Sequence, residues 1–251
     1  MSNRAQQIPL INGFIAPPHL CVPATSIQIS DCHGCESRDG CLADKMMSHP
    51  GYTAQVKSKN HVFRRGDHIF REGDLSSALN IVRSGSVKTY QSTEEGEEQV
   101  LGFNLPGDVI GLDGLENQKG LTSAIALETT SICKLPFAQL TDSGRGQVYP
   151  KLISQQISRD YHLFLMLVRK NADSRIASFL TDLSQRFESK GLSANVFNLS
   201  MSRQDIGNYL GLAIETVSRT LTRFQESGLI KITRRTVEIN DCEKLRRIAR
   251  A

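Results

Sequence analysis

Three cysteines lie within ten residues of one another near the beginning of the chain, at a spacing that suits metal binding. They are Cys32, Cys35 and Cys41, arranged as Cys-x2-Cys-x5-Cys. Thiolates at this spacing reach a single metal centre, as they do in zinc and iron–sulfur sites. Because a reducing compartment keeps thiols reduced, a metal explains the cluster better than a disulfide framework does.

A metal held by three thiolates needs a fourth ligand from elsewhere in the chain. Cys133 is the leading candidate, because it falls on a predicted strand of the central domain. Four thiolates suit either an iron–sulfur cluster or a structural zinc, and the spacing does not choose between them. If the metal is zinc, His33 or His49 is an alternative fourth ligand, since zinc commonly accepts mixed nitrogen and sulfur ligands.

A second group of residues with chemical potential lies near the C-terminus. Segment 202–211 is predicted to be a helix with a serine cap and a terminal glycine, and 213–225 a second amphipathic helix. Two short helices joined by a tight, glycine-containing turn make a helix-turn-helix. In segment 229–239, apolar and polar residues alternate in two short runs on either side of a basic tip. This pattern predicts a two-stranded hairpin, the wing of a winged helix-turn-helix. The alternative is a plain helical hairpin with no role in DNA binding.

In a helix-turn-helix, the first residues of the second helix face the base edges of DNA. Glu215 and Arg219 are four residues apart, so they share one face of the predicted helix. A glutamate on this face can accept a hydrogen bond from cytosine, and an arginine can donate two to guanine. The predicted DNA-binding residues are Arg203, Glu215, Thr216, Ser218 and Arg219. The alternative is a simple ion pair between Glu215 and Arg219, which contributes about 0.3 kcal/mol.

Between the two groups, residues 56–137 show short alternating or β-branched runs separated by glycines. Runs of this kind predict an antiparallel β-roll or barrel. Residues 1–30 contain prolines and no regular periodicity, so they are expected to be an irregular arm rather than a folded unit.

A long helix is predicted after the β-roll, from 151 to about 170, because apolar residues recur every three or four positions. It is longer than a small domain needs for its own core, so it is predicted to connect domains or to form a dimer seam. Its heptad positions carry Ile157, Asp160, Phe164 and Leu167. In a two-fold dimer, two Asp160 carboxylates would meet and weaken the seam through repulsion and desolvation. The alternative is that Asp160 lies at the rim and stays solvated.

Composition limits the class of protein. The 251 residues are 39% hydrophobic and 22% charged, which excludes collagen-like and wholly disordered chains. Residues 1–150 hold 13 basic and 16 acidic side chains, whereas residues 151–251 hold 17 and 10, so the C-terminal part is the candidate for a polyanion partner. With no signal peptide or membrane segment, the expected location is cytoplasmic. The motifs of common enzyme sites are missing, so an enzyme is not expected.

The predicted fold class is therefore α+β, with four parts. They are an N-terminal arm with the cysteine cluster (1–55), a β-roll sensor domain (56–148), a dimerisation helix (149–172) and a winged helix-turn-helix domain (173–251).

This combination resembles the CRP/FNR family of bacterial regulators, named after the cyclic-AMP receptor protein and the fumarate-and-nitrate-reduction (FNR) regulator. It is most similar to the oxygen-sensing FNR branch. The segments that carry the resemblance are 102–112, 126–133 and 202–228, above all the string 205–212 followed by 215–219.

The resemblance implies that Cys32, Cys35, Cys41 and Cys133 bind an oxygen-labile [4Fe-4S] cluster. It also implies that Glu215, Ser218 and Arg219 read a TTGAT-type half-site. In the branch, the intact cluster favours a homodimer on palindromic promoter DNA, and oxygen releases monomers. Asp160 falls where the branch carries an acidic residue that opposes dimerisation. RNA polymerase is a further expected partner, with the charged loop 93–98 as a candidate contact.

Binding of cyclic AMP is not expected. The parent family holds the nucleotide phosphate with a Gly-Glu-x-Gly segment and an Arg-Ser pair, whereas this chain has Gly111-Leu112-Asp113-Gly114 and Thr122-Ser123. Without the Glu and the Arg, a buried phosphate would lose its charge partner. Two alternatives remain: a zinc-stabilised regulator that responds to another signal, and a metal-binding redox protein without a DNA role.

Overall fold

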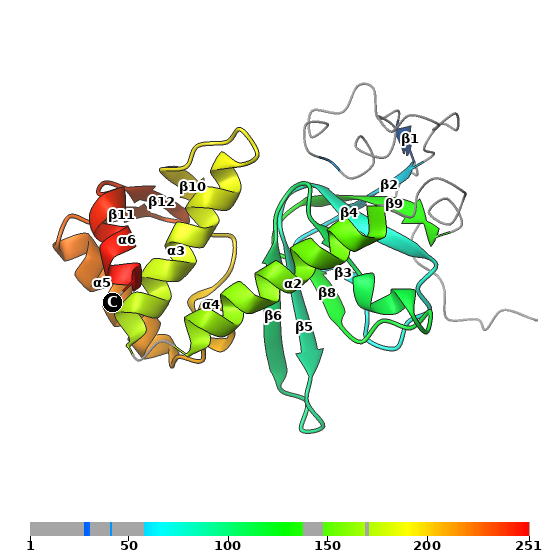
Figure 1. The fold of residues 1–251 in the computed structure, drawn as a ribbon, viewed down its shortest axis with the longest axis horizontal. Coiled ribbons are helices and arrows are strands. Elements are labelled where there is room, and N and C mark those ends of the chain that lie inside the picture. The colour runs from blue at the N-terminus through cyan, green and yellow to red at the C-terminus, as the bar shows by residue number, and fades with distance from the viewer. Residues whose placement is uncertain (1–27, 31–40, 42–57, 138–147, 169–170, 251) are drawn as a thin grey trace, which may run out of the picture.

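The computed structural model describes residues 28–30, 41, 58–137, 148–168 and 171–250 (Figure 1). Its central domain is a β-roll of two antiparallel sheets. The five-stranded sheet has the order β1-β2-β9-β4-β7 and the four-stranded sheet the order β3-β8-β5-β6. The strands are β1 (Gln28–Ser30), β2 (Ser58–Phe63), β3 (His68–Phe70), β4 (Ala78–Ser84), β5 (Val87–Ser92), β6 (Glu98–Asn104), β7 (Val109–Ile110), β8 (Ser123–Ala126) and β9 (Thr130–Pro136).

The β-roll core lies between the two sheets. Inward-facing residues from both sheets form it, namely Ile69, Val82, Val87, Ile110, Ala124 and Ile132. The turn between β4 and β5 requires Gly85, because its φ is +80° and a Cβ there would lie 2.5 Å from the Thr129 carbonyl oxygen. In the sequence, Gly85 separates two alternating runs that predicted strands. Steric crowding in this turn explains why the residue there is glycine.

The expectation of an irregular arm over residues 1–30 is wrong for its last three residues. Strand β1 pairs with β2, and Ile29 lies opposite Lys59. Three residues are too short to show a period, and the free edge of β2 supplies their backbone hydrogen bonds.

Two helices follow the β-roll. Helix α2 spans Val148–Leu167 and runs from the β-roll toward the C-terminal domain, where α3 (Ala172–Glu188) begins (Figure 1). Asn171 caps α3, because its Oδ1 accepts from the backbone N–H of Ser174 at 2.7 Å. In the described part of the chain, no helix is both long enough and apolar enough to cross a membrane.

The C-terminal domain is a winged helix-turn-helix, as predicted. Its helices are α4 (Arg203–Leu210), α5 (Ile214–Glu226) and α6 (Cys242–Arg250). Strands β11 (Ile230–Thr233) and β12 (Thr236–Ile239) form the wing, and β10 (Val196–Asn198) adds a third strand beside β12. Strand β10 and helix α6 were not predicted from the sequence.

The β-roll and the C-terminal domain share one apolar core. Phe103 of β6 lies against two aromatic rings of the C-terminal half, with ring centroids 5.9 Å from Phe179 of α3 and 5.1 Å from Tyr209 of α4. Val100 and Leu105 belong to the same buried cluster. The position of the helix-turn-helix relative to the β-roll is thus determined by packed side chains.

Candidate metal centre and DNA-binding surface

Two of the four predicted metal ligands lie at one apolar patch of the β-roll. Cys133 is on β9, where it pairs with Ile81 of β4. Cys133 and Cys41 are both half-buried and pack against the same cluster, which includes Ile81 and Leu152 of helix α2. The fold therefore brings a thiol of the N-terminal arm and a thiol of the central sheet to the beginning of α2.

The remaining two ligands, Cys32 and Cys35, lie outside the described residues, as do His33 and His49. Within the described ranges, no group of three or more His, Cys, Asp or Glu side chains forms a metal site. The donor set nevertheless fits a thiolate-bound centre, because Cys41 and Cys133 share one patch. Cys32 is nine positions from Cys41, a length of chain that spans at most about 30 Å.

The turn between α4 and α5 is tight, and the sequence determines it locally. Ser202 and Asp205 form a reciprocal capping box at the beginning of α4, and Gly211 ends the helix with a φ of +62°. A Cβ on Gly207 would lie 2.6 Å from the carbonyl oxygen of Leu212. Glycine at this position therefore allows the chain to pass close to α4 on its way into α5.

Helix α5 presents the predicted recognition residues to solvent. Glu215, Ser218 and Arg219 are exposed, whereas Val217 is buried. Thr216 is half-buried, and its hydroxyl accepts from Arg219 Nη2 at 3.5 Å. Among the ion pairs of the described residues there is none between Glu215 and Arg219, so the simple ion pair that was the alternative to DNA contact is not formed.

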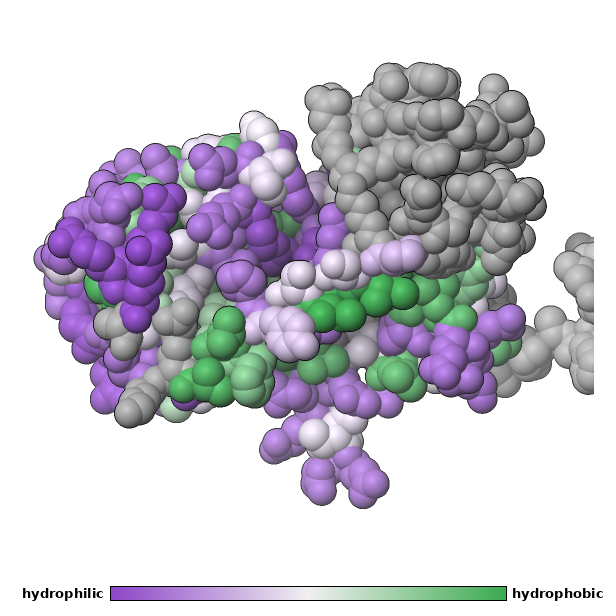
Figure 2. All heavy atoms as spheres, viewed as in Figure 1, coloured by the Kyte–Doolittle hydropathy of each residue, from purple (hydrophilic) through white to green (hydrophobic). Residues whose placement is uncertain are grey.

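The predicted dimer stripe on α2 is exposed in the single chain. Ile157 is 47% exposed, Phe164 60% and Leu167 36%. Figure 2 shows the apolar side chains of this stripe along α2. Asp160 is exposed within the stripe, and one of its carboxylate oxygens accepts from Gln156 Nε2 at 3.0 Å. Neighbouring exposed apolar side chains along one helix face are typical of an interaction surface.

Comparisons with known proteins decide the family. Residues 174–248 match the family model of a Crp-like helix-turn-helix domain, and residues 60–143 match that of a cyclic nucleotide-binding domain. The transcriptional activator protein Anr of Pseudomonas aeruginosa is 44% identical over 197 residues, which cover 76% of this chain and 80% of that protein. The fumarate and nitrate reduction regulatory protein of Yersinia pestis is 38% identical over 224 residues, covering 87% and 90%. This chain is an FNR-type member of the CRP/FNR family.

A solved structure agrees with this assignment. FixK2 from Bradyrhizobium japonicum superposes with a TM-score of 0.70 and 29% identity, over 77% of this chain and 98% of that one. The FNR-type chain is thus a transcription regulator with a DNA-binding helix-turn-helix and is not an enzyme, as the sequence predicted.

In this FNR-type regulator, Asp108 connects the β-roll to both following helices. Its buried carboxylate accepts from Arg159 of α2 at 2.8 Å, from Arg186 of α3 at 2.7 Å and from Lys190 at 2.9 Å. The backbone N–H of Leu105 also donates to it at 2.8 Å. Burial alone would raise the pKa of Asp108, but the three cations outweigh burial and hold the pKa well below its usual range.

A second polar contact joins the β-roll to the helix-turn-helix itself. Lys88 of β5 forms ion pairs with Glu98 at 2.5 Å and with Asp205 of α4 at 3.0 Å. Burial alone would lower the pKa of Lys88, but its hydrogen bonds to these two carboxylates outweigh burial and raise it. Asn208 of α4 accepts from the backbone N–H of Val100 at 2.6 Å. Sequence reasoning missed these contacts, because no local pattern pairs residues so far apart in the chain.

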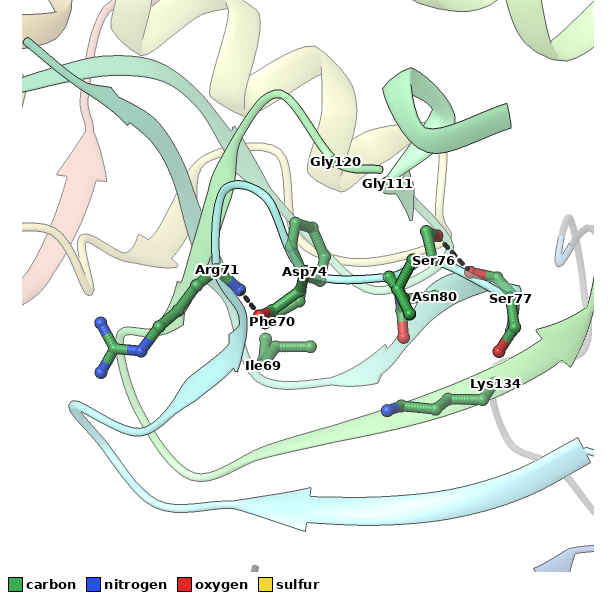
Figure 3. Close-up of a pocket in the computed structure, with 12 residues that line it drawn as sticks. Ile69, Phe70, Arg71, Asp74, Ser76, Ser77, Asn80, Gly111, Gly120 and Lys134 are labelled. Carbon is green, nitrogen blue, oxygen red and sulfur yellow. Dashed lines mark hydrogen bonds between the residues drawn. The ribbon is translucent and has the colours of Figure 1, made fainter. Parts of the chain in front are cut away.

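In the parent family, one loop of the β-roll holds the nucleotide phosphate. In this chain, the acidic side chain of the corresponding loop is taken up by hydrogen bonds within the same region. Asp113 accepts from the backbone N–H of Leu121 at 2.7 Å and from the Thr122 hydroxyl at 3.0 Å. Beside this loop is a cavity of about 90 Å³, lined by Gly111, Asn80 and Lys134 among others (Figure 3). This volume is well below the roughly 300 Å³ at which pockets for drug-sized ligands begin.

Proposed function

We propose that this protein is a cytoplasmic, oxygen-responsive transcription regulator. Cys32, Cys35, Cys41 and Cys133 hold a [4Fe-4S] cluster, and a homodimer formed through α2 binds palindromic TTGAT-type promoter DNA when oxygen is absent. Oxygen degrades the cluster and releases the protein from DNA. The proposal rests on the juxtaposition of Cys41 and Cys133 at the beginning of α2. The names of the FNR and Anr relatives support it.

The arrangement of residues explains how the state of the metal centre would reach the dimer seam. When bound, the cluster would supply oxygen-sensitive iron–sulfur chemistry, and it would be held by cysteines of the N-terminal arm together with Cys133 of β9. Leu152 packs against the same apolar patch as Cys41 and Cys133, so the position of the arm bears directly on the first turns of α2. Ile157, Asp160 and Phe164 follow on the same helix, where a small shift changes how two apolar stripes meet.

Dimerisation would then control DNA binding, because a palindromic site needs two recognition helices at a set spacing. Glu215, Ser218 and Arg219 of each subunit would read one half-site. The same loop of the β-roll that binds the nucleotide in the parent family has Asp113 at its centre, which would repel a phosphate. We therefore propose that cyclic AMP is not the signal.

The metal assignment is tested by iron, sulfide and zinc analysis of protein purified without oxygen. We expect about four irons per chain, a visible absorbance band that bleaches in air, and loss of both in Cys41→Ala and Cys133→Ala. Cys242→Ala is the matched control, because Cys242 lies on α6 in the other domain. One zinc per chain and indifference to air would refute the oxygen-sensing part and favour the zinc-stabilised alternative.

DNA recognition is tested separately by fluorescence anisotropy on a TTGAT palindrome and on a scrambled duplex. Arg219→Ala is expected to remove the preference for the palindrome, because each bidentate contact to guanine discriminates by about 1 to 3 kcal/mol. Arg247→Ala removes a similar charge from an exposed position of α6 and should retain the preference. If Arg219→Ala binds the palindrome as selectively as the wild type, the assigned recognition residues are wrong.

A further inference from the structure

The cavity of about 90 Å³ in the β-roll is lined by β3, by the segment between β3 and β4, and by β4 and β9 (Figure 3). Among the described residues that line it, Gly111 alone belongs to the loop that holds the nucleotide phosphate in the parent family, and none belongs to α2. The cavity is therefore a different site from the phosphate-binding loop.

Two polar side chains face the interior of the β-roll at this cavity. Asn80 of β4 and Lys134 of β9 lie opposite each other in the register of the two strands. Val82, two residues after Asn80, and Ile132, two residues before Lys134, belong to the buried core between the sheets. Because strand residues two positions apart share a face, Asn80 and Lys134 also point inward.

Neither side chain has its polar end satisfied within the described part of the chain. Asn80 is only 7% exposed, and its Oδ1 accepts no hydrogen bond from the described residues. Lys134 is half-buried, and no described carboxylate pairs with its ammonium group, whereas Lys88 of the same domain pairs with two. Buried polar groups in native proteins almost always have partners, so an acceptor and a cation on neighbouring strands indicate a site for a polar anion.

We propose that this cavity binds a small hydroxycarboxylate, a carboxylate of few atoms that also carries a hydroxyl group. The ligand carboxylate accepts a charge-assisted hydrogen bond from Lys134 Nζ, and the ligand hydroxyl donates to Asn80 Oδ1. Ser76 and Ser77 line the same cavity with hydroxyl groups, which can donate to the second carboxylate oxygen. One ligand of this class therefore satisfies both groups that the described residues leave unpaired.

The size of the cavity and the charges around it favour this class of ligand. A cavity of about 150 Å³ in another protein holds benzene, so about 90 Å³ has room for roughly three to five heavy atoms, which includes glycolate. Asp74 is the acidic side chain among the described lining residues, and it accepts from the backbone N–H of Arg71 at 2.8 Å. Figure 3 shows Arg71 and Asp74 at the end of the cavity away from Lys134. The end at Lys134 is thus the one suited to an anion.

The ligand would bind to the same two strands that contribute to the candidate metal centre. Cys133 directly precedes Lys134 on β9 and lies opposite Ile81 of β4, on the other face of the sheet. There it packs against the cluster that includes Leu152 of α2. A hydroxycarboxylate on the inner face would therefore give the regulator a second signal besides oxygen. This consequence rests on the proposed function, whereas binding of the ligand does not.

The test is isothermal titration calorimetry of the full-length protein at constant ionic strength, with sodium glycolate and with sodium acetate, which has no hydroxyl. We expect saturable glycolate binding with a dissociation constant on the order of 1 mM, and acetate binding about tenfold weaker, because acetate leaves Asn80 Oδ1 without a donor. Lys134→Met should weaken binding of both anions by about tenfold or more, whereas Asn80→Leu should remove only the advantage of glycolate. Lys231→Met is the matched control, because Lys231 is an exposed lysine on β11 in the other domain.

The outcomes separate this inference from the proposed function. Absence of saturable glycolate binding in the wild type would overturn the inference, as would equal affinities for glycolate and acetate, or wild-type affinity in Lys134→Met. Circular dichroism reports whether the variants fold, and if one does not, the comparison of glycolate with acetate on the wild type decides. Iron content and DNA preference are measured without glycolate, so failure of the proposed function is seen independently.

Discussion

Arg186 of α3 donates to the buried carboxylate of Asp108 at 2.7 Å, and this ion pair joins the β-roll to the C-terminal half of the protein. The Asp108 side chain is only 2% exposed. Arg159 of α2 and Lys190 beyond α3 donate to the other carboxylate oxygen. One acidic residue in the turn before β7 is therefore bound to α2, to α3 and to the segment that follows α3.

Substitution of Asp108 should destabilise the whole protein. Asp108→Asn keeps the shape of the side chain but leaves the half-buried Lys190 without its carboxylate and the half-buried Arg186 with only Asp182, at 3.5 Å. Removal of one partner of a buried ion pair costs about 3 to 5 kcal/mol. Urea unfolding measures the change, with Glu116→Gln as the control, since Glu116 is an exposed carboxylate of the same domain. If Asp108→Asn lowers the free energy of unfolding by less than about 1 kcal/mol, the Asp108 contacts contribute no more than a surface ion pair does. That result would contradict the role of Asp108 as a buried link between the domains.

The contribution of Asp108 should also depend on pH. Its pKa is lower in the folded state than in the unfolded chain, so the carboxylate stabilises the fold above about pH 4, the usual pKa of Asp. This stabilisation is lost progressively as the pH falls below that value toward the folded pKa. The difference in unfolding free energy between wild type and Asp108→Asn should therefore be constant near neutral pH and shrink under acid. A difference that stays constant down to pH ~2.5 contradicts the ion-pair explanation.

Gly207→Ala should disturb the helix-turn-helix. The new methyl group would lie 2.6 Å from the backbone oxygen of Leu212, so the turn between α4 and α5 must open. We expect a loss of about 1 to 3 kcal/mol in stability and a larger loss of DNA affinity, because α5 is displaced. Gly120→Ala is the control, since the nearest atom to a Cβ there is 3.5 Å away. Equal thermal stability of the two variants would show that the turn between α4 and α5 can accommodate a methyl group at position 207, which contradicts the prediction.

Asp160→Ala should strengthen the dimer. In the proposed symmetric seam through α2, the two Asp160 side chains would face each other among Ile157 and Phe164, so removal of the carboxylates would relieve repulsion and desolvation. Sedimentation equilibrium in air is the measurement, and we expect a larger dimer fraction than for the wild type. Glu226→Ala, at the end of α5, is the control for a lost acidic charge. An unchanged monomer–dimer equilibrium would place Asp160 at a solvated rim.

Local signals in the sequence were sufficient for the helix-turn-helix and most of the β-roll. Ser202 and Asp205 cap α4, and Gly211 ends it, through contacts within a few residues. The wing was predicted from alternation about Arg234 and Arg235, and the structure has β11 and β12 there. Strands β1 and β7 were missed, because two or three residues show no periodicity and depend on a neighbouring strand for their hydrogen bonds.

The sequence by itself determined the identity of the chemical groups and the elements that carry them. It predicted four cysteine ligands, a recognition helix with Glu215 and Arg219, and an exposed apolar helix. Only the tertiary structure placed Cys41 beside Cys133, joined Asp108 to Arg186, and brought Arg65 next to the wing. Caps, turns and periodic faces arise from residues close in the chain, whereas these residues meet only when the β-roll, the helices and the wing pack together.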